Sequence, residues 1–244
     1  NKISIDYIWL LIIKSIEMKK TIFIFLLVFS LSVYSQNILW EQVGLKVTQG
    51  TENFVLELVD DFYTSIEKPE NVVISLDAVW YRPEGFETTH YLTFAGSAED
   101  LGKLRELRSG SVYDQYNQNF LNFAEITSIS SGGTLMRFNV EKGNYPISQM
   151  WRFSVEDPVT FANEFVKMIK EFPPEGYLSI GLLSQGSDGD SHYIYTTHKD
   201  YATALSWGPK TEGQQNAFMK FQKIVNPISD YLGTITMNNI KTWN

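Results

Sequence analysis

The sequence predicts an α+β fold made of two tandem βαββαβ units. Strand-like alternation and helix-like periodicity of apolar residues follow each other in this order twice along the chain. A hydrophobic content of 43%, with 14% aromatic residues, supports a packed core rather than disorder. The two units are expected to have the same order of elements.

The first unit is expected over residues 36–140. Its second strand shows the strand pattern clearly, because Ile74, Leu76 and Ala78 occupy every second position. Ser97, followed closely by acidic residues, has the composition of a helix N-terminus. The expected elements are a strand at 40–47, a helix at 52–67, strands at 71–82 and 86–95, helices from 97 and at 112–126, and a strand at 134–139.

A linker at 141–148 and a second unit over residues 149–244 follow. Asp157 and Pro158 predict a helix start, with Asp as the capping residue and Pro in the first turn. The segment ETTHYL at 87–92 aligns with GDSHYI at 189–194, which supports an internal duplication. The expected elements are strands at 150–155, 177–184, 192–197 and 232–237, and helices at 159–172, 200–206 and 212–225.

This order of elements, which occurs twice in the chain, resembles that of the dimeric α+β barrel superfamily, whose units are ferredoxin-like. The antibiotic-biosynthesis-monooxygenase-like and stress-responsive barrel proteins belong to it. The resemblance covers residues 37–244 and rests on topology, including an aromatic-rich hairpin and a split second helix. It implies a monomeric pseudo-dimer with two facing sheets and the helices outside. The superfamily includes cofactor-free oxygenation, isomerisation, haem chemistry and plain binding, so the resemblance carries over no functional residue.

The N-terminal region predicts export. Residues 18–35 have the layout of a cleaved signal peptide, with a basic start, a 13-residue apolar run at 21–33 and Ser35 before the cleavage site. That run is shorter than a membrane span requires. Residues 1–17 are interpreted as upstream translated sequence or a mis-called start, and a two-helix membrane anchor is the rival interpretation. The expected location is secreted or periplasmic, without a stable membrane span after cleavage.

Composition excludes several classes of partner. The net charge is −8, and removal of residues 1–35, which carry four Lys and two acidic residues, leaves −10. An acidic surface repels nucleic acid and anionic lipid, so neither is an expected partner. The chain has no cysteine, which excludes disulfides and thiol chemistry.

One face of each sheet is a candidate ligand site. Alternation places polar and aromatic residues on the face away from the helices, whereas a dry core between sheets would be aliphatic. The full set is Gln42, Lys46, Ser75, Asp77, Val79, Tyr81, Tyr91, Thr93, Arg137, Arg152, Ser154, Ser179, Tyr193, Tyr195, Thr234 and Thr236. The proposed ligand contacts are Asp77, Tyr81, Tyr91, Arg137, Arg152, Tyr193 and Tyr195. A solvated sheet face that binds nothing is the alternative.

The histidines are secondary candidates. His90 and His192 occupy matching strand positions, in phase with apolar residues of the helix-packed face. A structural role is favoured for both, and a pseudo-symmetric acid–base pair is the alternative. His198 is expected to be exposed at a helix start. The Ser187–Asp190 segment is interpreted as a hairpin turn, since it lacks the further ligands of a calcium loop. No metal or cofactor is expected.

Three functions remain open from the sequence alone. The first is an exported protein that binds a small molecule in a cavity between the two facing sheets. The second is a cofactor-independent enzyme, of oxygenase or isomerase type, acting on a small aromatic substrate in that cavity. The third is a self-associating barrel with a structural role. A titratable residue with a shifted pKa in an enclosed site would favour the enzyme.

Overall fold

The computed structural model describes residues 38–143, 145–187 and 189–244. The predictions about residues 1–17 and about the signal peptide at 18–35 lie outside these residues. The first half contains β1 (Leu39–Val47), α2 (Glu52–Ser65), β2 (Val73–Tyr81), β3 (His90–Gly96), α3 (Ala98–Leu107), α4 (Gly110–Phe120) and β4 (Ala124–Phe138). The second half contains β5 (Ile147–Val155), α5 (Pro158–Glu171), β6 (Leu178–Gln185), β7 (His192–His198), α6 (Tyr201–Leu205), α7 (Glu212–Val225) and β8 (Ser229–Trp243).

The described strands close into a barrel in the order β1-β3-β2-β8-β5-β7-β6-β4, and all neighbours pair antiparallel. Each half contributes four consecutive strands of this ring. The halves join where β2 pairs with β8 and where β4 pairs with β6. The predicted α+β fold of two ferredoxin-like units is therefore confirmed, with the two sheets joined edge to edge into one closed barrel.

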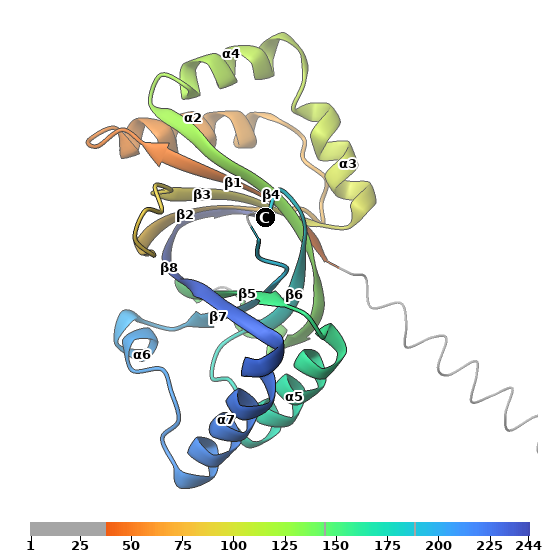
Figure 1. Cartoon of the computed structure of the whole chain (residues 1–244). Coiled ribbons are helices and arrows are strands. Elements are labelled where there is room, and N and C mark those ends of the chain that lie inside the picture. The colour runs from red at the N-terminus through yellow and green to blue at the C-terminus, as the bar shows by residue number, and fades with distance from the viewer. Residues whose placement is uncertain (1–37, 144, 188) are drawn as a thin grey trace, which may run out of the picture. The chain divides into compact units, whose positions relative to one another are not determined.

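The helices lie outside the barrel, with α2, α3 and α4 against one half and α5, α6 and α7 against the other (Figure 1). Each half has its own core between its sheet and its helices. Phe94 and Val59 belong to the first core, and Phe161 and Ile180 to the second, and all four are fully buried. Burial of such side chains supplies the main stabilisation in a chain without disulfides.

Local sequence signals explain where several helices begin. The Ser97 side chain accepts a hydrogen bond from the backbone N–H of Asp100, and Asp157 accepts one from Thr160. Thr211 caps α7 in the same way. Each side chain satisfies a backbone donor that the first helical turn leaves free. No helix within the described ranges is long and apolar enough to cross a membrane.

Strands β4 and β8 are much longer than predicted. The sequence predicted strands at 134–139 and 232–237, whereas β4 spans Ala124–Phe138 and β8 spans Ser229–Trp243. The segment before residue 134 is rich in Ser and Gly, which have low strand propensity, so its pattern does not identify a strand. Its extended form comes from pairing, because one end of β4 binds β1 of its own half and the other binds β6.

Candidate functional site

The inward face of the barrel brings together most of the predicted ligand contacts. These are Asp77, Tyr91, Arg137, Arg152, Tyr193 and Tyr195. Asp77 lies opposite Tyr91 across the β2–β3 pair, and Arg152 lies opposite Tyr193 across the β5–β7 pair. Tyr91 and Tyr193 pack in the same buried cluster although they come from different halves. The sequence therefore identified residues that share one enclosed space.

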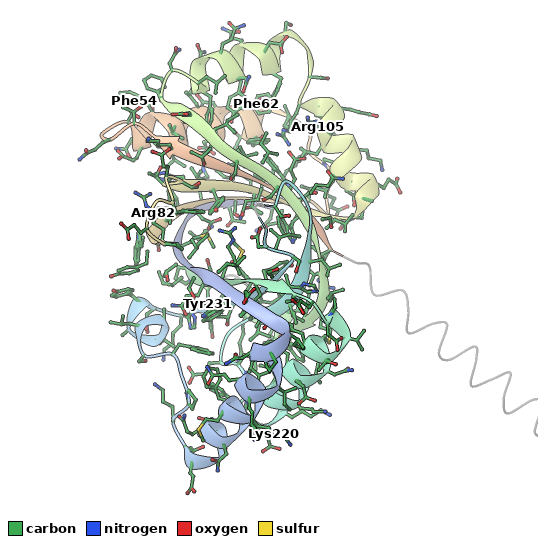
Figure 2. All side chains as sticks on the ribbon, in the orientation of Figure 1. Phe54, Phe62, Arg82, Arg105, Lys220 and Tyr231 are labelled. Carbon is green, nitrogen blue, oxygen red and sulfur yellow. The ribbon has the colours of Figure 1, made fainter. Side chains whose placement is uncertain are left out.

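A large part of this space is filled by side chains (Figure 2). The filling cluster consists of Tyr91, Met150, Tyr193, Ile235 and Met237, with Trp40, Val79, Phe86, Leu183 and Tyr195 packed against it. The prediction that β8 contributes Thr234 and Thr236 to this face is wrong. Thr234 lies opposite Trp151, a residue of the second core, so both point towards the helices. A one-residue error in phase exchanges the two faces of a strand.

Tyr81 is the predicted ligand contact that leaves the interior. The pairing of β2 with β8 shifts register between Val79 and Tyr81, which changes the direction of the strand end. Tyr81 is 53% exposed, and its ring stacks on Tyr201 of α6 at a centroid distance of 6.1 Å. The two hydroxyl groups also share a hydrogen bond. Tyr81 therefore ties β2 to α6 on the outside of the barrel.

Arg152 and Asp190 form a buried ion pair that sequence reasoning missed. The Arg152 Nε donates to Asp190 Oδ2 at 2.5 Å, and the Asp190 side chain is only 1% exposed. The guanidinium also lies 5.9 Å from the centroid of the Phe86 ring. Burial raises the pKa of Tyr91 to about 12, and the charge of Arg152 opposes this shift. The positive charge of Arg152 is thus neutralised within the protein.

Asp77 is a second inward carboxylate, and its hydrogen-bond partners are neutral. Its Oδ1 accepts from Asn239 Nδ2 at 2.9 Å, and its Oδ2 accepts from Ser75 Oγ at 2.7 Å. Burial raises the pKa of Asp77, and the two hydrogen bonds partly oppose the increase. Burial also raises the pKa of Tyr195 above its usual range, and the charge of Asp77 adds to that effect. Both residues lie on the inward face of the barrel.

The phenol of Tyr193 is held by the protein. Its hydroxyl accepts from Trp40 Nε1 at 3.1 Å and lies 3.3 Å from Thr134 Oγ1. The ring occupies the space above Gly181, where a Cβ would lie 2.4 Å from the Tyr193 ring. Burial raises the pKa of Tyr193, although both hydrogen bonds lower it. These contacts give Tyr193 a structural role in the interior cluster.

The three histidines are buried on the side of the strands that faces the helices. His90 and His192 lie where their phase with Leu92 and Ile194 predicts, and burial lowers the pKa of each. The prediction that His198 is exposed is wrong, because it ends β7, is 5% exposed and lies 3.1 Å from Gln149 Oε1. Pairing of β7 with β5 carries the strand one residue beyond its predicted end.

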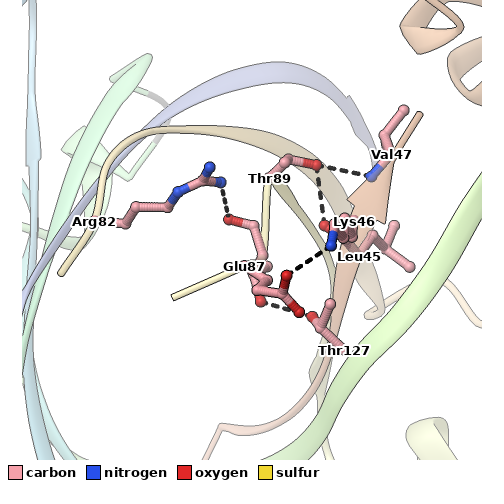
Figure 3. Close-up of polar contacts among 8 residues, drawn as sticks. Leu45, Lys46, Val47, Arg82, Glu87, Thr89 and Thr127 are labelled. Carbon is pink, nitrogen blue, oxygen red and sulfur yellow. Dashed lines mark hydrogen bonds and ion pairs between the residues drawn. The ribbon is translucent and has the colours of Figure 1, made fainter. Parts of the chain in front are cut away.

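An open groove of about 1040 Å³ lies at one mouth of the barrel. It is lined by the end of β1, the loop between β2 and β3, and the start of β4. Figure 3 shows how its polar side chains are engaged. Lys46, which has the predicted inward phase between the core residues Leu45 and Val47, pairs with Glu87 at 2.6 Å. Arg82 donates to the Thr88 carbonyl at 2.8 Å. Such exposed pairs contribute little binding energy of their own.

A second hollow, of about 420 Å³, is apolar and lies between the sheet and the helices of the second half. Trp207 forms one wall, with its ring 4.9 Å from Trp151 and 5.7 Å from Phe172. The polar groups at its border come from Gln222, Asn226, Ser229 and Tyr231. The complete lining is Trp151, Phe153, Phe165, Met168, Ile169, Phe172, Pro174, Leu178, Ile194, Trp207, Phe218, Phe221, Gln222, Val225, Asn226, Ser229 and Tyr231.

The described residues offer little for a metal or a haem. No group of three or more His, Asp or Glu side chains that could hold a metal ion occurs among them. Haem iron is most often held by an axial His or Cys, less often by Met or Tyr. The described lining of the apolar hollow has no His, its Met168 is packed in the second core, and its Tyr231 hydroxyl is hydrogen-bonded to Thr234. The described lining of this hollow therefore offers no imidazole to hold haem iron.

Comparison with solved structures identifies proteins that share this fold. No protein-family model matches the chain, and no curated protein matches its sequence. Among solved structures, an anthrone oxidase-like protein is similar with a TM-score of 0.54 and 12% identity, covering 86% of this chain and 94% of that chain. A candidate monooxygenase from Fusobacterium nucleatum has a TM-score of 0.56 and 14% identity, covering 87% and 96%.

Two further solved structures extend the comparison. A candidate monooxygenase from Lactobacillus acidophilus has a TM-score of 0.56 and 12% identity, covering 84% of this chain and 95% of that chain. A candidate chlorite dismutase has a TM-score of 0.51 and 8% identity, covering 84% and 96%. These likenesses show the fold, which is that of the dimeric α+β barrel proteins with both halves in one chain. At such low identity they show nothing about the reaction.

Proposed function

We propose that this chain is an exported protein that binds a small, neutral, largely apolar molecule in the hollow of its second half. The observation that carries the proposal is the hollow itself, since about 420 Å³ of apolar space with a few polar groups is typical of ligand pockets. This puts the ligand between the sheet and the helices, and not between the two sheets as the sequence predicted.

The first half supports this assignment by contrast. The space between its sheet and its helices is filled by aromatic side chains, in which Phe62 stacks on Tyr116 at a centroid distance of 4.5 Å. Arg108 lies over Phe94 at 4.2 Å and pairs with Glu41. The two halves share their topology, so the hollow in the second half reflects its own side chains.

The lining defines the chemistry of the ligand. No charged side chain occurs among the described residues that line the hollow, so an ionised ligand group would lose its hydration without a partner. Aromatic rings make up much of the wall, which favours a flat molecule that stacks against Trp207. The amides of Gln222 and Asn226 can hydrogen-bond one polar end group.

A pair of matched substitutions tests the pocket. Ile194 lines the hollow, whereas Leu92 holds the equivalent position in the filled first core. With the neutral fluorescent probe N-phenyl-1-naphthylamine, I194F is expected to fold normally and to lose about tenfold or more of the probe affinity. L92F should keep the affinity but lose about 1–3 kcal/mol of unfolding free energy through overpacking. Equal probe affinity in I194F and in the unchanged protein would contradict the pocket.

An oxygenase that works without a cofactor is a second candidate. The observation in its favour is that the anthrone oxidase-like protein and the two candidate monooxygenases share this fold. The hollow suits a flat aromatic ketone, but its described lining offers no carboxylate or imidazole as a general base. Exposure of the protein to anthrone in air distinguishes the two functions. Catalysed oxidation of anthrone that I194F abolishes would support the enzyme, whereas binding without turnover would support the binding protein.

A further inference from the structure

Asp77 is an inward-facing carboxylate whose two hydrogen-bond donors, Asn239 and Ser75, are both neutral. Across the described part of the chain, no Lys, Arg or His forms an ion pair with it. Asp190, another inward carboxylate, is paired with Arg152. An enclosed charge normally has a counter-charge, so Asp77 is an exception that requires an explanation.

Water reaches Asp77 from inside the barrel. Asp77 and its inward-facing neighbours Ser75, Thr93 and Tyr195 are only half-buried, whereas Leu76, on the opposite face of the same strand, is 1% exposed. The interior near Asp77 is therefore solvated, unlike the adjoining cluster around Met150 and Met237.

Aromatic groups adjoin this carboxylate. Tyr91 lies directly opposite Asp77 across the β2–β3 pair, and Tyr195 faces the same interior from β7. The Tyr177 ring meets the Tyr195 ring edge to face at a centroid distance of 6.1 Å. A carboxylate together with tyrosine rings is the combination that proteins use to bind organic ammonium ions, because the ring faces attract cations. Arg137, an inward-facing cation on β4, forms no ion pair with Asp77.

We propose that the barrel interior binds a small organic ammonium ion, with Asp77 as its counter-charge and Tyr195 as an inward-facing aromatic surface. A metal ion fits less well, because Ca²⁺ and Mg²⁺ require several oxygen ligands and no cluster of three acidic side chains surrounds Asp77 in the described residues. The net charge of −8 also favours the accumulation of cations. This site is separate from the apolar hollow of the second half.

Titration calorimetry with tetramethylammonium chloride tests the proposal, at constant ionic strength adjusted with sodium chloride. The unchanged protein is expected to bind, and D77N is expected to bind about tenfold or more weakly, because the substitution removes the charge with little change in shape. D61N is the matched control, since Asp61 is exposed on α2 and its loss changes the net charge equally. D61N should bind as the unchanged protein does.

A second measurement does not depend on any variant. Carbon NMR of the Asp77 carboxyl should show its pKa fall when tetramethylammonium is added, because a bound cation stabilises the ionised form. Absence of binding by the unchanged protein, an unshifted Asp77 signal, or equal affinity in D77N would each overturn the proposal. Binding of N-phenyl-1-naphthylamine should be unaffected by tetramethylammonium, so failure of one site leaves the test of the other intact.

Discussion

At the scale of single residues, the inward-facing carboxylates Asp77 and Asp190 have different environments. Asp190 is 1% exposed in its side chain and is neutralised by Arg152 at 2.5 Å. Asp77 keeps partial access to water and relies on Asn239 and Ser75. The ion pair of Asp190 with Arg152 holds the loop that precedes β7 against strand β5. Asp77, by contrast, leaves a negative charge available inside the barrel. This difference is the basis for assigning a structural role to Asp190 and a ligand-binding role to Asp77.

The stability of D77N is expected to exceed that of the unchanged protein at neutral pH. Burial raises the pKa of Asp77 above its ordinary value of 3.8, so the folded state binds this proton more tightly than the unfolded state. Ionisation of Asp77 therefore lowers stability above its folded pKa, and the loss disappears below about pH 3.8. Thermal unfolding at pH 7 should show a melting temperature about 2–4 °C higher in D77N.

The same melting experiment contains its own control. The advantage of D77N over the unchanged protein should shrink as the pH approaches 4, because Asp77 of the unchanged protein then takes up a proton and residue 77 is uncharged in both proteins. D61N should show no comparable advantage, since Asp61 lies exposed on α2. A melting temperature that falls in D77N at pH 7 would contradict the view that the charge of Asp77 is a cost to the fold.

At the scale of elements, the long strands β4 and β8 hold the two halves together. Each pairs with a strand of its own half along one stretch and with a strand of the other half along another. The β4–β6 pairing requires a close approach at Gly132, where a Cβ would lie 2.1 Å from the Leu182 carbonyl oxygen and 2.4 Å from the Trp40 ring. Gly133, the next residue, has more room.

Alanine at Gly132 is therefore expected to weaken the junction between the halves. G132A should lower the free energy of unfolding by about 1–3 kcal/mol, because β6 must move away from β4 to admit the methyl group. At Gly133 the nearest atom to a Cβ is the end of the Leu39 side chain at 3.0 Å, which can move. G133A should thus change stability by less than about 1 kcal/mol. Urea unfolding measures both, and equal effects would contradict this account of the junction.

At the scale of the whole molecule, closure of the barrel removes the exposed sheet edges that each half would otherwise present. An unpaired edge strand is a site for aggregation, and four such edges are consumed by the β2–β8 and β4–β6 pairings. The same closure buries Tyr91 and Tyr193 in one shared cluster. Fusion of two units thus accomplishes within one chain what two separate chains would achieve by association.

Export is the prediction that belongs to the whole chain. Protein secreted by a host that recognises the segment at 18–35 should begin at Gln36, within about two residues. Intact mass spectrometry of the secreted material gives the first residue directly. A matched variant with Lys19 and Lys20 replaced by Glu should remain unprocessed, because the basic start of the signal is lost. Secreted protein that retains residues 18–35 would refute a cleaved signal peptide.

The sequence by itself determined the order of elements and the helix-packed face of most strands. These are local properties, since apolar spacing and capping residues such as Ser97 and Asp157 act within a few positions. It also identified Asp77 and Tyr195 as inward-facing, because alternation along a regular strand is reliable. The function classes excluded by charge and by the absence of cysteine depended on composition alone.

Only the tertiary structure decided the lengths of β4 and β8, the outward turn of Tyr81 and the partner of Arg152. Each depends on residues distant in the sequence, so local pattern carries no information about it. The apolar hollow is the clearest case, because Ile194 and Leu92 hold equivalent positions and only the side chains packed around them differ. Whether a core is filled or hollow depends on the sum of volumes that meet there, and that sum is fixed when the chain folds.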